Sequence, residues 1–385
     1  MDYSYIINHL NEERDDYFGA VSPALIQTSN FAFSNVAQLR KAIFKEDEHY
    51  LYSRGKNPTT DILCSKLAAL ANAESALVFS SGMAAMSSAI LSLVKAGDHV
   101  ICQLHPYSWT KRLCSKILPS FGVSVSFADG TLTENIIREC RSDTKLIILE
   151  SPNTFTFELQ NLAEVVSFAQ EKEIYTIIDN SYCTSLGQRC IDMGISLEVH
   201  SMSKYYSGHS DVVAGCVIGK KELIEKIFVN GLQNLGGILS PFDAWLTLRG
   251  LRTLAARMEK IAKTTAQVVD FLYSNPRVEK VLYPFHHSFA QYDLAQKQMS
   301  WCGGLFSILL NAKDMHVVEN FVNKLKRFMI AVSWGGHESL VFPACAAMPE
   351  GKPTGHLPYN LVRFYCGLEE PGALIEDLKQ ALDQI

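Results

Sequence analysis

Hydrophobic and polar residues follow two different periods along the middle of the chain. Short apolar runs have the composition of strands buried on both faces, and they alternate with segments in which apolar residues recur every three or four positions. The predicted strands are 76–80, 99–104, 145–151, 175–180, 197–203 and 214–219. The predicted helices between them are 82–95, 109–118, 132–140 and 162–173. This alternation predicts a mainly parallel sheet covered by helices on both faces.

Both ends of the chain differ from this alternating segment. The first sixty residues have short apolar patches interrupted by turns that contain proline and glycine, which is typical of an irregular arm. After Gly219 a long helical pattern over 241–274 is followed by fewer strands mixed with helices. We therefore predict an N-terminal arm at 1–60, a large domain at 61–250 and a smaller C-terminal α/β domain at 251–385.

Composition and charge exclude several classes of protein. With 35 Lys and Arg against 40 Asp and Glu, the formal charge of -5 leaves no basic surface for general nucleic-acid binding. The ten cysteines form no CxxC pair and no zinc spacing, so we expect neither a metal site nor a redox motif. No apolar run is long enough to span a bilayer, and the N-terminus is too polar for a signal peptide. We expect a soluble cytoplasmic enzyme.

Candidate chemistry lies where the predicted strands end, because ligands of open parallel sheets bind outside the carboxyl ends of the strands. Gly82 and Met83 open a helix after the first strand, where free N–H groups attract anions, although an ordinary capped turn explains them as well. Asp179 ends another strand, and it either faces a ligand or caps a turn. Lys204 follows the strand 197–203 among small hydroxyl and turn residues.

One cofactor would use all three strand ends. Pyridoxal phosphate needs an anion cradle for its phosphate, a carboxylate beside its ring nitrogen, and a lysine that forms a Schiff base with it. The hydroxyls of Ser201 and Ser203 stand close in sequence to Lys204 and could bind the same phosphate. No single position is specific for this cofactor, but their joint occurrence at successive strand ends is.

Longer motifs point the same way. YSRGKNPT, SSGMAA, PYSWT, ESPNTFTFE, IIDNSY, SMSKYYSGHSDVVAG, SPFDAWLTLRGLRTL and SWGGHESL occur in this order along the chain. In order and spacing they resemble the pyridoxal-phosphate enzymes of cysteine and methionine metabolism, which include the cystathionine lyases and synthase and methionine γ-lyase. The resemblance covers almost the whole chain. It implies an aspartate-aminotransferase-like fold (fold type I), with a seven-stranded, mainly parallel sheet in the large domain, and a homotetramer.

The resemblance also implies a role for individual residues. Lys204 would bind the cofactor and move protons, Asp179 would pair with the ring nitrogen, and Tyr107 would stack on the ring and take part in catalysis. Tyr52 and Arg54 would reach the cofactor phosphate of a neighbouring subunit, so that active sites are shared. The implied cofactor contacts are Lys204, Asp179, Gly82, Met83, Ser201, Ser203, Tyr107, Tyr52, Arg54 and Thr154. Arg363 and Ser333 would bind the α-carboxylate of the amino-acid substrate, since a planar bidentate donor suits a carboxylate.

The reaction type stays open between members of the resembled family. SWGGHES, with Trp334 after Ser333, and ESPNTFTFE are similar to cystathionine β-lyases, whereas YSRGKNPT is closer to the γ-synthase and γ-lyase form. Trp109 stands where methionine γ-lyases have cysteine, and Val332 stands where cystathionine γ-lyases often have glutamate. We favour β-elimination of cystathionine or a related thioether to a thiol, pyruvate and ammonia. The alternatives are γ-elimination, γ-replacement, an aminotransferase, and a catalytically weak cofactor-binding homologue.

Overall fold

The computed structural model describes residues 1–349, 352 and 355–385, and the chain divides into two compact units. The large unit contains residues 1–151, 160–207 and 211–252. The small unit contains residues 152–159, 208–210 and 253–385, so two short segments that interrupt the large unit in the sequence belong to it. No helix among the described residues is both long enough and apolar enough to cross a membrane.

The large unit is built on a seven-stranded sheet with the order β1-β7-β6-β5-β4-β2-β3. Only β7 runs antiparallel to its neighbours, so the carboxyl ends of the other six strands lie at the same end of the sheet. This confirms the predicted α/β fold with a mainly parallel sheet. The strands are β1 (Ser75–Phe79), β2 (His99–Gln103), β3 (Ser124–Ala128), β4 (Thr144–Glu150), β5 (Tyr175–Asp179), β6 (Leu197–Ser201) and β7 (Gly215–Gly219).

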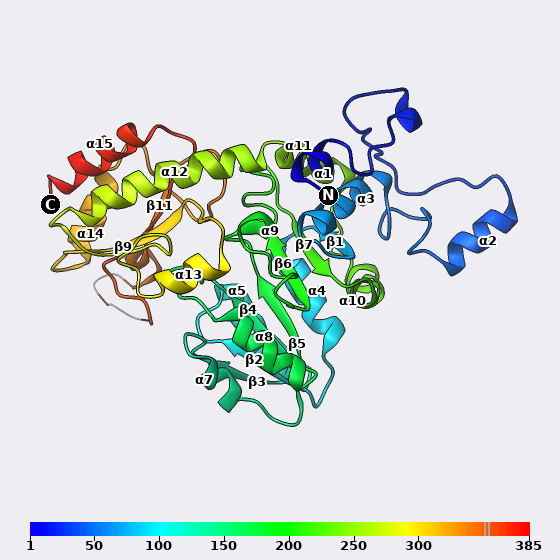
Figure 1. Ribbon diagram of the computed structural model, residues 1–385, viewed down its shortest axis with the longest axis horizontal. Helices are drawn as coiled ribbons and strands as arrows, with labels where there is room; N and C mark the ends of the chain where they lie inside the picture. The colour runs from blue at the N-terminus through cyan, green and yellow to red at the C-terminus, as the bar shows by residue number, and fades with distance from the viewer. Residues whose placement is uncertain (350–351, 353–354) are drawn as a thin grey trace. The chain divides into compact units, whose positions relative to one another are not determined.

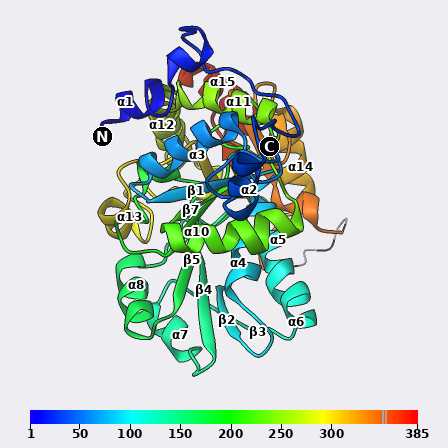
Figure 2. The same cartoon turned by 90° about the vertical axis from the view of Figure 1, so that its right-hand side faces the viewer.

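Apolar side chains on both faces of this sheet are buried by helices, as Figure 2 shows for α7 and α8 on one side and α4 to α6 on the other. Neighbouring residues of β4 point to opposite faces of the sheet, so Ile148 packs in one hydrophobic cluster and Ile147 and Leu149 pack in the other. The helices around the sheet are α4 (Gly82–Leu93), α5 (Ser108–Arg112), η2 (Leu113–Ile117), α6 (Leu118–Ser120), α7 (Thr133–Arg138), α8 (Leu162–Glu171), α9 (Thr184–Gly187), α10 (Lys221–Ile227), η3 (Phe228–Gln233) and α11 (Pro241–Leu251).

Two sequence-based expectations about these elements were wrong. The strand β3 was not predicted, because it lies at the edge of the sheet and its run SVSFA is only partly buried, so it lacks a continuous apolar signal. The single long helix predicted over 241–274 is two helices, α11 and α12 (Leu254–Tyr273). The break falls at Thr253, whose backbone (φ −109°, ψ 4°) leaves the helical region, and the two compact units meet in the sequence at this point.

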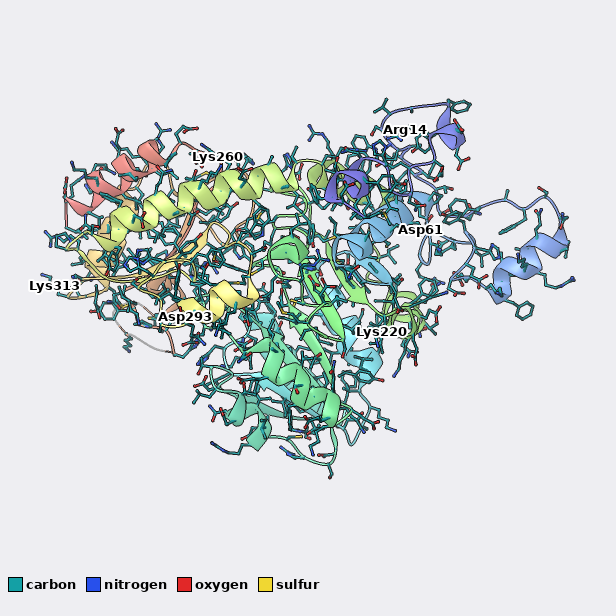
Figure 3. All side chains as sticks on the ribbon, in the orientation of Figure 1. Arg14, Asp61, Lys220, Lys260, Asp293 and Lys313 are labelled. Carbon is teal, nitrogen blue, oxygen red and sulfur yellow. The ribbon has the colours of Figure 1, made fainter. Side chains whose placement is uncertain are left out.

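The N-terminal segment of the large unit is held by a buried ion cluster. Glu12 is surrounded by three cations: its carboxylate lies 3.0 Å from Lys66 Nζ, 3.0 Å from an Arg252 nitrogen and 3.4 Å from an Arg14 nitrogen. Lys66 also donates to the carbonyls of Ile6 (2.7 Å) and Ile7. Burial lowers the pKa of Lys66, although Glu12 opposes the shift. Figure 3 labels Arg14 in this segment, which comprises α1 (Tyr3–Asn8), η1 (Arg14–Tyr17), α2 (Val36–Phe44) and α3 (Pro58–Leu70).

The small unit has a five-stranded sheet with the order β10-β11-β12-β9-β8 in the described part of the chain. Its pairs are antiparallel except β10 with β11. The strands are β8 (Val278–Leu282), β9 (Leu305–Leu310), β10 (Met329–Ile330), β11 (Leu340–Pro343) and β12 (Leu361–Tyr365). The helices, of which α12 is the long one in Figure 1, are α12, α13 (Tyr292–Gln298), α14 (Met315–Lys324), η4 (Ala344–Ala347) and α15 (Pro371–Leu382). This is the smaller second sheet that the fold class predicts.

Candidate active site

An anion cradle forms where β1 passes into α4. The Ser81 hydroxyl accepts the N–H of Ala84 at 3.0 Å, and the Ser81 carbonyl accepts the N–H of Ala85 at 3.1 Å. These bonds leave the N–H groups of Gly82 and Met83 without an acceptor among the described residues. Both groups sit at the positive end of a twelve-residue helix, where an anion is stabilised.

The cradle is pressed directly against the end of β6. A side-chain carbon at Gly82 would lie 2.9 Å from Cβ of Ser201, so only glycine allows this approach. Gly215 on β7 is tighter still, since a carbon added there would collide with the backbone of Ser81 and Gly82. The structure therefore brings Gly82 and Ser201 together, as the predicted phosphate site requires, and it adds Gly215 as a residue that sequence reasoning did not single out.

Lys204 lies in the turn that follows β6. Its N–H donates to the carbonyl of Ser201 at 3.2 Å, and the N–H of Ser207 donates to the carbonyl of Met202 at 3.0 Å, so the turn is closed on itself. The hydroxyl of Ser203 accepts the N–H of Ala214 at 3.0 Å, which fastens the turn to the segment before β7. Lys204 thus follows the cradle residue Ser201 by three positions on a braced turn.

Asp179 ends β5, the neighbour of β6 in the sheet. One carboxylate oxygen accepts two hydrogen bonds from Ser181, from the N–H at 3.0 Å and from the hydroxyl at 2.6 Å. That hydroxyl in turn accepts the N–H of Ser201 at 2.7 Å. The second oxygen of Asp179 has no hydrogen bond within the described chain, so it is available to a cationic ring nitrogen. Ser181, which joins Asp179 to the cradle, was missed by the sequence analysis.

Tyr107 begins α5 after the end of β2, and its ring is 40% exposed. Its N–H donates to a carboxylate oxygen of Glu150 at 2.5 Å. Glu150 is buried at the end of β4, beside Asp179 in the register of the sheet. Sequence reasoning missed Glu150 as well, although its place at a strand end is the same signal that identified Asp179.

Tyr52 and Arg54 form a pair in the N-terminal segment of the large unit. The Arg54 guanidinium lies 5.5 Å from the centre of the Tyr52 ring, and its Nε donates to Gln233 at 3.0 Å. Tyr52 is 44% exposed. The structure keeps the aromatic ring and the cation next to each other, and their predicted role toward a neighbouring subunit stays a prediction.

Arg363 lies in the small unit, in the middle of β12, where it is 7% exposed. Two neighbouring aromatic rings lie against its guanidinium: the ring centre of Phe155 is 4.7 Å away and that of Phe342 is 5.5 Å away. A guanidinium held against aromatic rings gains a cation–π contact, and its planar pair of donors matches a planar acceptor such as a carboxylate. Phe155 and Phe342 were not predicted, because nothing in their local sequence marks them as partners of an arginine.

The other predicted residues of the small unit lie near this arginine or its partners. Ser333 and Arg363 line the same small hollow. Ser333 has a left-handed backbone (φ 76°), which is unusual for a serine and orients the chain beside the hollow. Thr154 lies in the loop 152–159, which is held by Asn153, whose side-chain oxygen accepts the N–H groups of Thr156 and Phe157. Thr154 thereby directly precedes Phe155, which stacks on Arg363.

A family description that reads "Cys/Met metabolism PLP-dependent enzyme" matches residues 5–383. The chain belongs to this family. It is a pyridoxal-phosphate-dependent carbon–sulfur lyase. The resemblance seen in the motifs, the fold class and the cofactor predicted from the strand ends are thereby confirmed.

Relatives within the family cover nearly the whole chain. The L-methionine gamma-lyase of Treponema denticola is 38% identical over 376 residues, which are 96% of this chain and 94% of that protein. The cystathionine gamma-lyase of Rattus norvegicus is 38% identical over 352 residues, 88% and 87% of the two chains. A putative O-acetylhomoserine (thiol)-lyase from Campylobacter jejuni, solved with N'-pyridoxyl-lysine-5'-monophosphate, superposes with a TM-score of 0.94 at 26% identity and covers all of both chains.

The large unit of this family member fits pyridoxal phosphate. The two acceptor-free N–H groups at Gly82 and Met83 suit its phosphate, and the second oxygen of Asp179 suits its ring nitrogen. Lys204 supplies an amine on the adjoining turn. Metal-ligand clusters of three or more His, Cys, Asp or Glu are not found among the described residues. Burial and then Glu198 raise the pKa of the Cys190 and Cys216 thiols, which favours their protonated form.

Proposed function

We propose that this enzyme eliminates a thiol from an L-amino acid thioether, and that it cleaves at the γ-carbon. Two γ-lyases at 38% identity over most of the chain support the γ-position over the β-elimination that the motifs favoured. With L-methionine and one water, the products would be methanethiol, 2-oxobutanoate and ammonia. With L-cystathionine and one water, they would be cysteine, 2-oxobutanoate and ammonia.

The observation that carries this proposal is the strand-end cluster of the large unit. Gly82 is pressed against Ser201, and the turn with Lys204 begins directly after it. We assign to Lys204 the covalent attachment of the cofactor and the removal of the Cα proton of the substrate. Asp179 would hold a proton on the ring nitrogen through its second carboxylate oxygen. When bound, pyridoxal phosphate supplies an electron sink for the charge left at Cα.

We assign the remaining steps to Tyr107 and Arg363. The Tyr107 ring is anchored through its backbone N–H to Glu150 and is exposed enough to stack on a bound ring and to carry a proton. Arg363 would bind the substrate α-carboxylate with its planar pair of donors, assisted by the backbone at Ser333. A substrate without a free α-carboxylate would therefore be a poor one.

A second candidate is β-elimination of L-cystathionine, which yields homocysteine, pyruvate and ammonia. Trp334 after Ser333 and the motif ESPNTFTFE support it, because both are similar to cystathionine β-lyases. Trp109 weakens the case for L-methionine as the substrate, since methionine γ-lyases have cysteine at this position, but it does not distinguish β- from γ-elimination. Trp109 is 56% exposed on α5, two residues after Tyr107.

We further propose a cytoplasmic homotetramer in which Tyr52 and Arg54 complete the site of a neighbouring subunit. Exposed apolar residues of the N-terminal segment support a covering partner: Val36 and Phe44 are 67% and 81% exposed on α2, which lies away from the rest of the large unit in Figure 1. The mixed assembly of an Arg54→Ala subunit with a Lys204→Ala subunit tests sharing. If sites are shared, the mixture regains activity that neither variant has alone.

Product analysis decides between the two reactions. Purified protein with pyridoxal phosphate is incubated separately with L-methionine and L-cystathionine, and the keto acids and thiols are identified. We expect 2-oxobutanoate from both substrates, and no product from the Lys204→Ala control. Formation of pyruvate and homocysteine from cystathionine would show that the reaction is β-elimination and not γ-elimination. Absence of any keto acid from either substrate, with cofactor bound, would refute the lyase assignment for both.

A further inference from the structure

The strand β6 carries two polar residues that no step of the proposed reaction uses. Its run LEVHS contains Glu198 and His200, and each is fully buried at 0% exposure. A buried carboxylate is costly unless several donors compensate the loss of water. Two such residues in the strand that leads to Lys204 therefore require an explanation.

One oxygen of Glu198 collects three hydrogen bonds. It accepts from Asn180 Nδ2 at 2.8 Å and from Ser185 Oγ at 2.7 Å, and His200 Nε2 lies 2.7 Å away. As the tautomer with hydrogen on Nε2, His200 is the third donor. Asn180 directly follows Asp179, so Glu198 holds the strand end that carries the predicted partner of the ring nitrogen.

The same network continues to the lysine turn. Because Ser185 donates to Glu198, its hydroxyl accepts from the Tyr206 hydroxyl, 2.9 Å away. The N–H of Ser185 also donates to Tyr206 Oη at 3.2 Å, and the Tyr206 ring stands edge-on to His200 with centres 4.9 Å apart. Burial, followed by Glu198, raises the pKa of Tyr206, so its hydroxyl keeps its proton. Tyr206 is two residues beyond Lys204.

We propose that Glu198 is a positioning residue that fixes Asp179 relative to Lys204. The chain of contacts runs from Asn180 through Glu198 and Ser185 to Tyr206, inside the large unit, and each of these residues is at most 1% exposed. A buried hydrogen-bonded network of this kind prevents the functional groups that it supports from shifting out of position. The inference rests on the proposed roles of Asp179 and Lys204 toward the cofactor.

The test uses Glu198→Gln, Tyr206→Phe and the double variant. The affinity of the apo-protein for pyridoxal phosphate is measured by titration, and the visible circular dichroism of the bound cofactor reports its orientation. We expect Glu198→Gln to weaken affinity about tenfold and Tyr206→Phe roughly threefold, the range of one hydrogen bond. We expect both to change the dichroic band. Because they break one chain of contacts, the double variant should lose less than the product of the two losses.

Asp377→Asn is the matched control. Asp377 is a buried carboxylate of the small unit whose oxygens accept the N–H groups of Lys326 and Arg327 at 2.7 to 3.0 Å. Like Glu198→Gln, Asp377→Asn replaces a buried, hydrogen-bonded carboxylate and should lower the stability of the fold. It breaks no contact between Asp179 and Lys204. We expect its affinity for pyridoxal phosphate and its dichroic band to match those of the wild type.

The possible results distinguish failure of the proposed function from failure of the positioning role of Glu198. If the wild-type protein binds no pyridoxal phosphate, the proposed function fails. If it binds the cofactor while Glu198→Gln and Tyr206→Phe leave the dichroic band unchanged, the positioning role is wrong and the proposed function stands. Losses that multiply fully in the double variant also overturn it. Should Glu198→Gln not fold, Tyr206→Phe still decides, because it removes one hydroxyl and keeps the ring.

Discussion

The two units hold their candidate site residues by different physical means. In the large unit, Asp179 and the cradle at Gly82 are held by hydrogen bonds from small residues such as Ser181 and by glycine-tight packing. In the small unit, the guanidinium of Arg363 lies against two neighbouring aromatic rings, those of Phe155 and Phe342. Hydrogen bonds fix distances between atoms, whereas cation–π contacts hold a charge near aromatic rings with a less strict geometry.

This difference in how the residues are held corresponds to a difference in their proposed functions. We assign the residues of the large unit to the cofactor and those of the small unit to the substrate carboxylate. Substitutions in the large unit should therefore change the spectrum of the bound cofactor. Substitutions around Arg363 should change the KM for the substrate and leave that spectrum unchanged.

The largest effect is expected for Lys204→Ala. Removing the amine removes both covalent attachment and the base, so kcat should fall by more than about 10⁴-fold. The visible absorption of the lysine-bound cofactor should disappear, as measured by absorbance of protein saturated with pyridoxal phosphate. Lys220→Ala, at the surface before α10, is the control and should keep both activity and band. An unchanged band in Lys204→Ala would remove Lys204 from the site.

Arg363→Lys should have the next largest effect. It keeps the charge but loses the planar pair of donors, so kcat/KM should fall roughly 10- to 100-fold, mainly through KM. Steady-state kinetics with L-methionine measure it, and the cofactor spectrum serves as the internal control. A loss of cofactor absorption with unchanged KM would contradict the assignment of the two units.

Alkaline pH should destabilise the large unit more than the small one. Burial raises the pKa of the Cys64, Cys190 and Cys216 thiols of the large unit and of the Cys345 and Cys366 thiols of the small unit. The folded chain then keeps protons that the unfolded chain loses above about pH 9, so stability falls as pH rises. Each thiol should raise the unfolding constant about tenfold between pH 9 and 10.

Urea unfolding at pH 8 and pH 10 measures this effect. Trp109 and Trp245 report on the large unit when Trp301 and Trp334 are replaced by phenylalanine. The reverse pair of substitutions reports on the small unit. The larger shift of the midpoint is expected for the large unit, and Cys216→Ala should reduce it. Equal shifts in both units would contradict the prediction.

Phe155→Leu should have the smallest effect. It removes one aromatic face from Arg363 but keeps an apolar contact, so KM should rise about two- to fivefold with kcat unchanged. Phe342→Leu should give a similar but weaker rise, because its ring is farther from the guanidinium. If both variants behave as the wild type, the aromatic faces do not orient the arginine.

Hydrophobic periodicity was sufficient to predict the buried strands and the class of fold. Strands such as β4 and β7 have continuous apolar runs because helices cover both faces of the sheet. The edge strand β3 lacks this signal, since much of it is exposed to water. The break at Thr253 was not predicted either, because no proline stands there and Gly250, three residues earlier, lies inside α11.

Candidate site residues could be named where a residue ends a strand, and not where it acts through a second side chain. Asp179 and Lys204 became candidates because they occur jointly with Gly82 at successive strand ends, not from either position alone. Ser181 and Glu150 touch residues 20 and 43 positions away along the chain, and local sequence does not reveal such pairs. Glu198 is intermediate, because a glutamate in an apolar strand signals a buried partner without identifying it.

The ion cluster around Glu12 sets a limit for anyone who shortens this chain. Deleting the first twelve residues would remove the only acid that faces Lys66 and Arg252 in the described structure, together with the carbonyls of Ile6 and Ile7. A lysine 1% exposed would then have to be hydrated or lose its proton, and either change opens α3. A shortened version that folds should therefore carry an uncharged residue at this position, as in Lys66→Met.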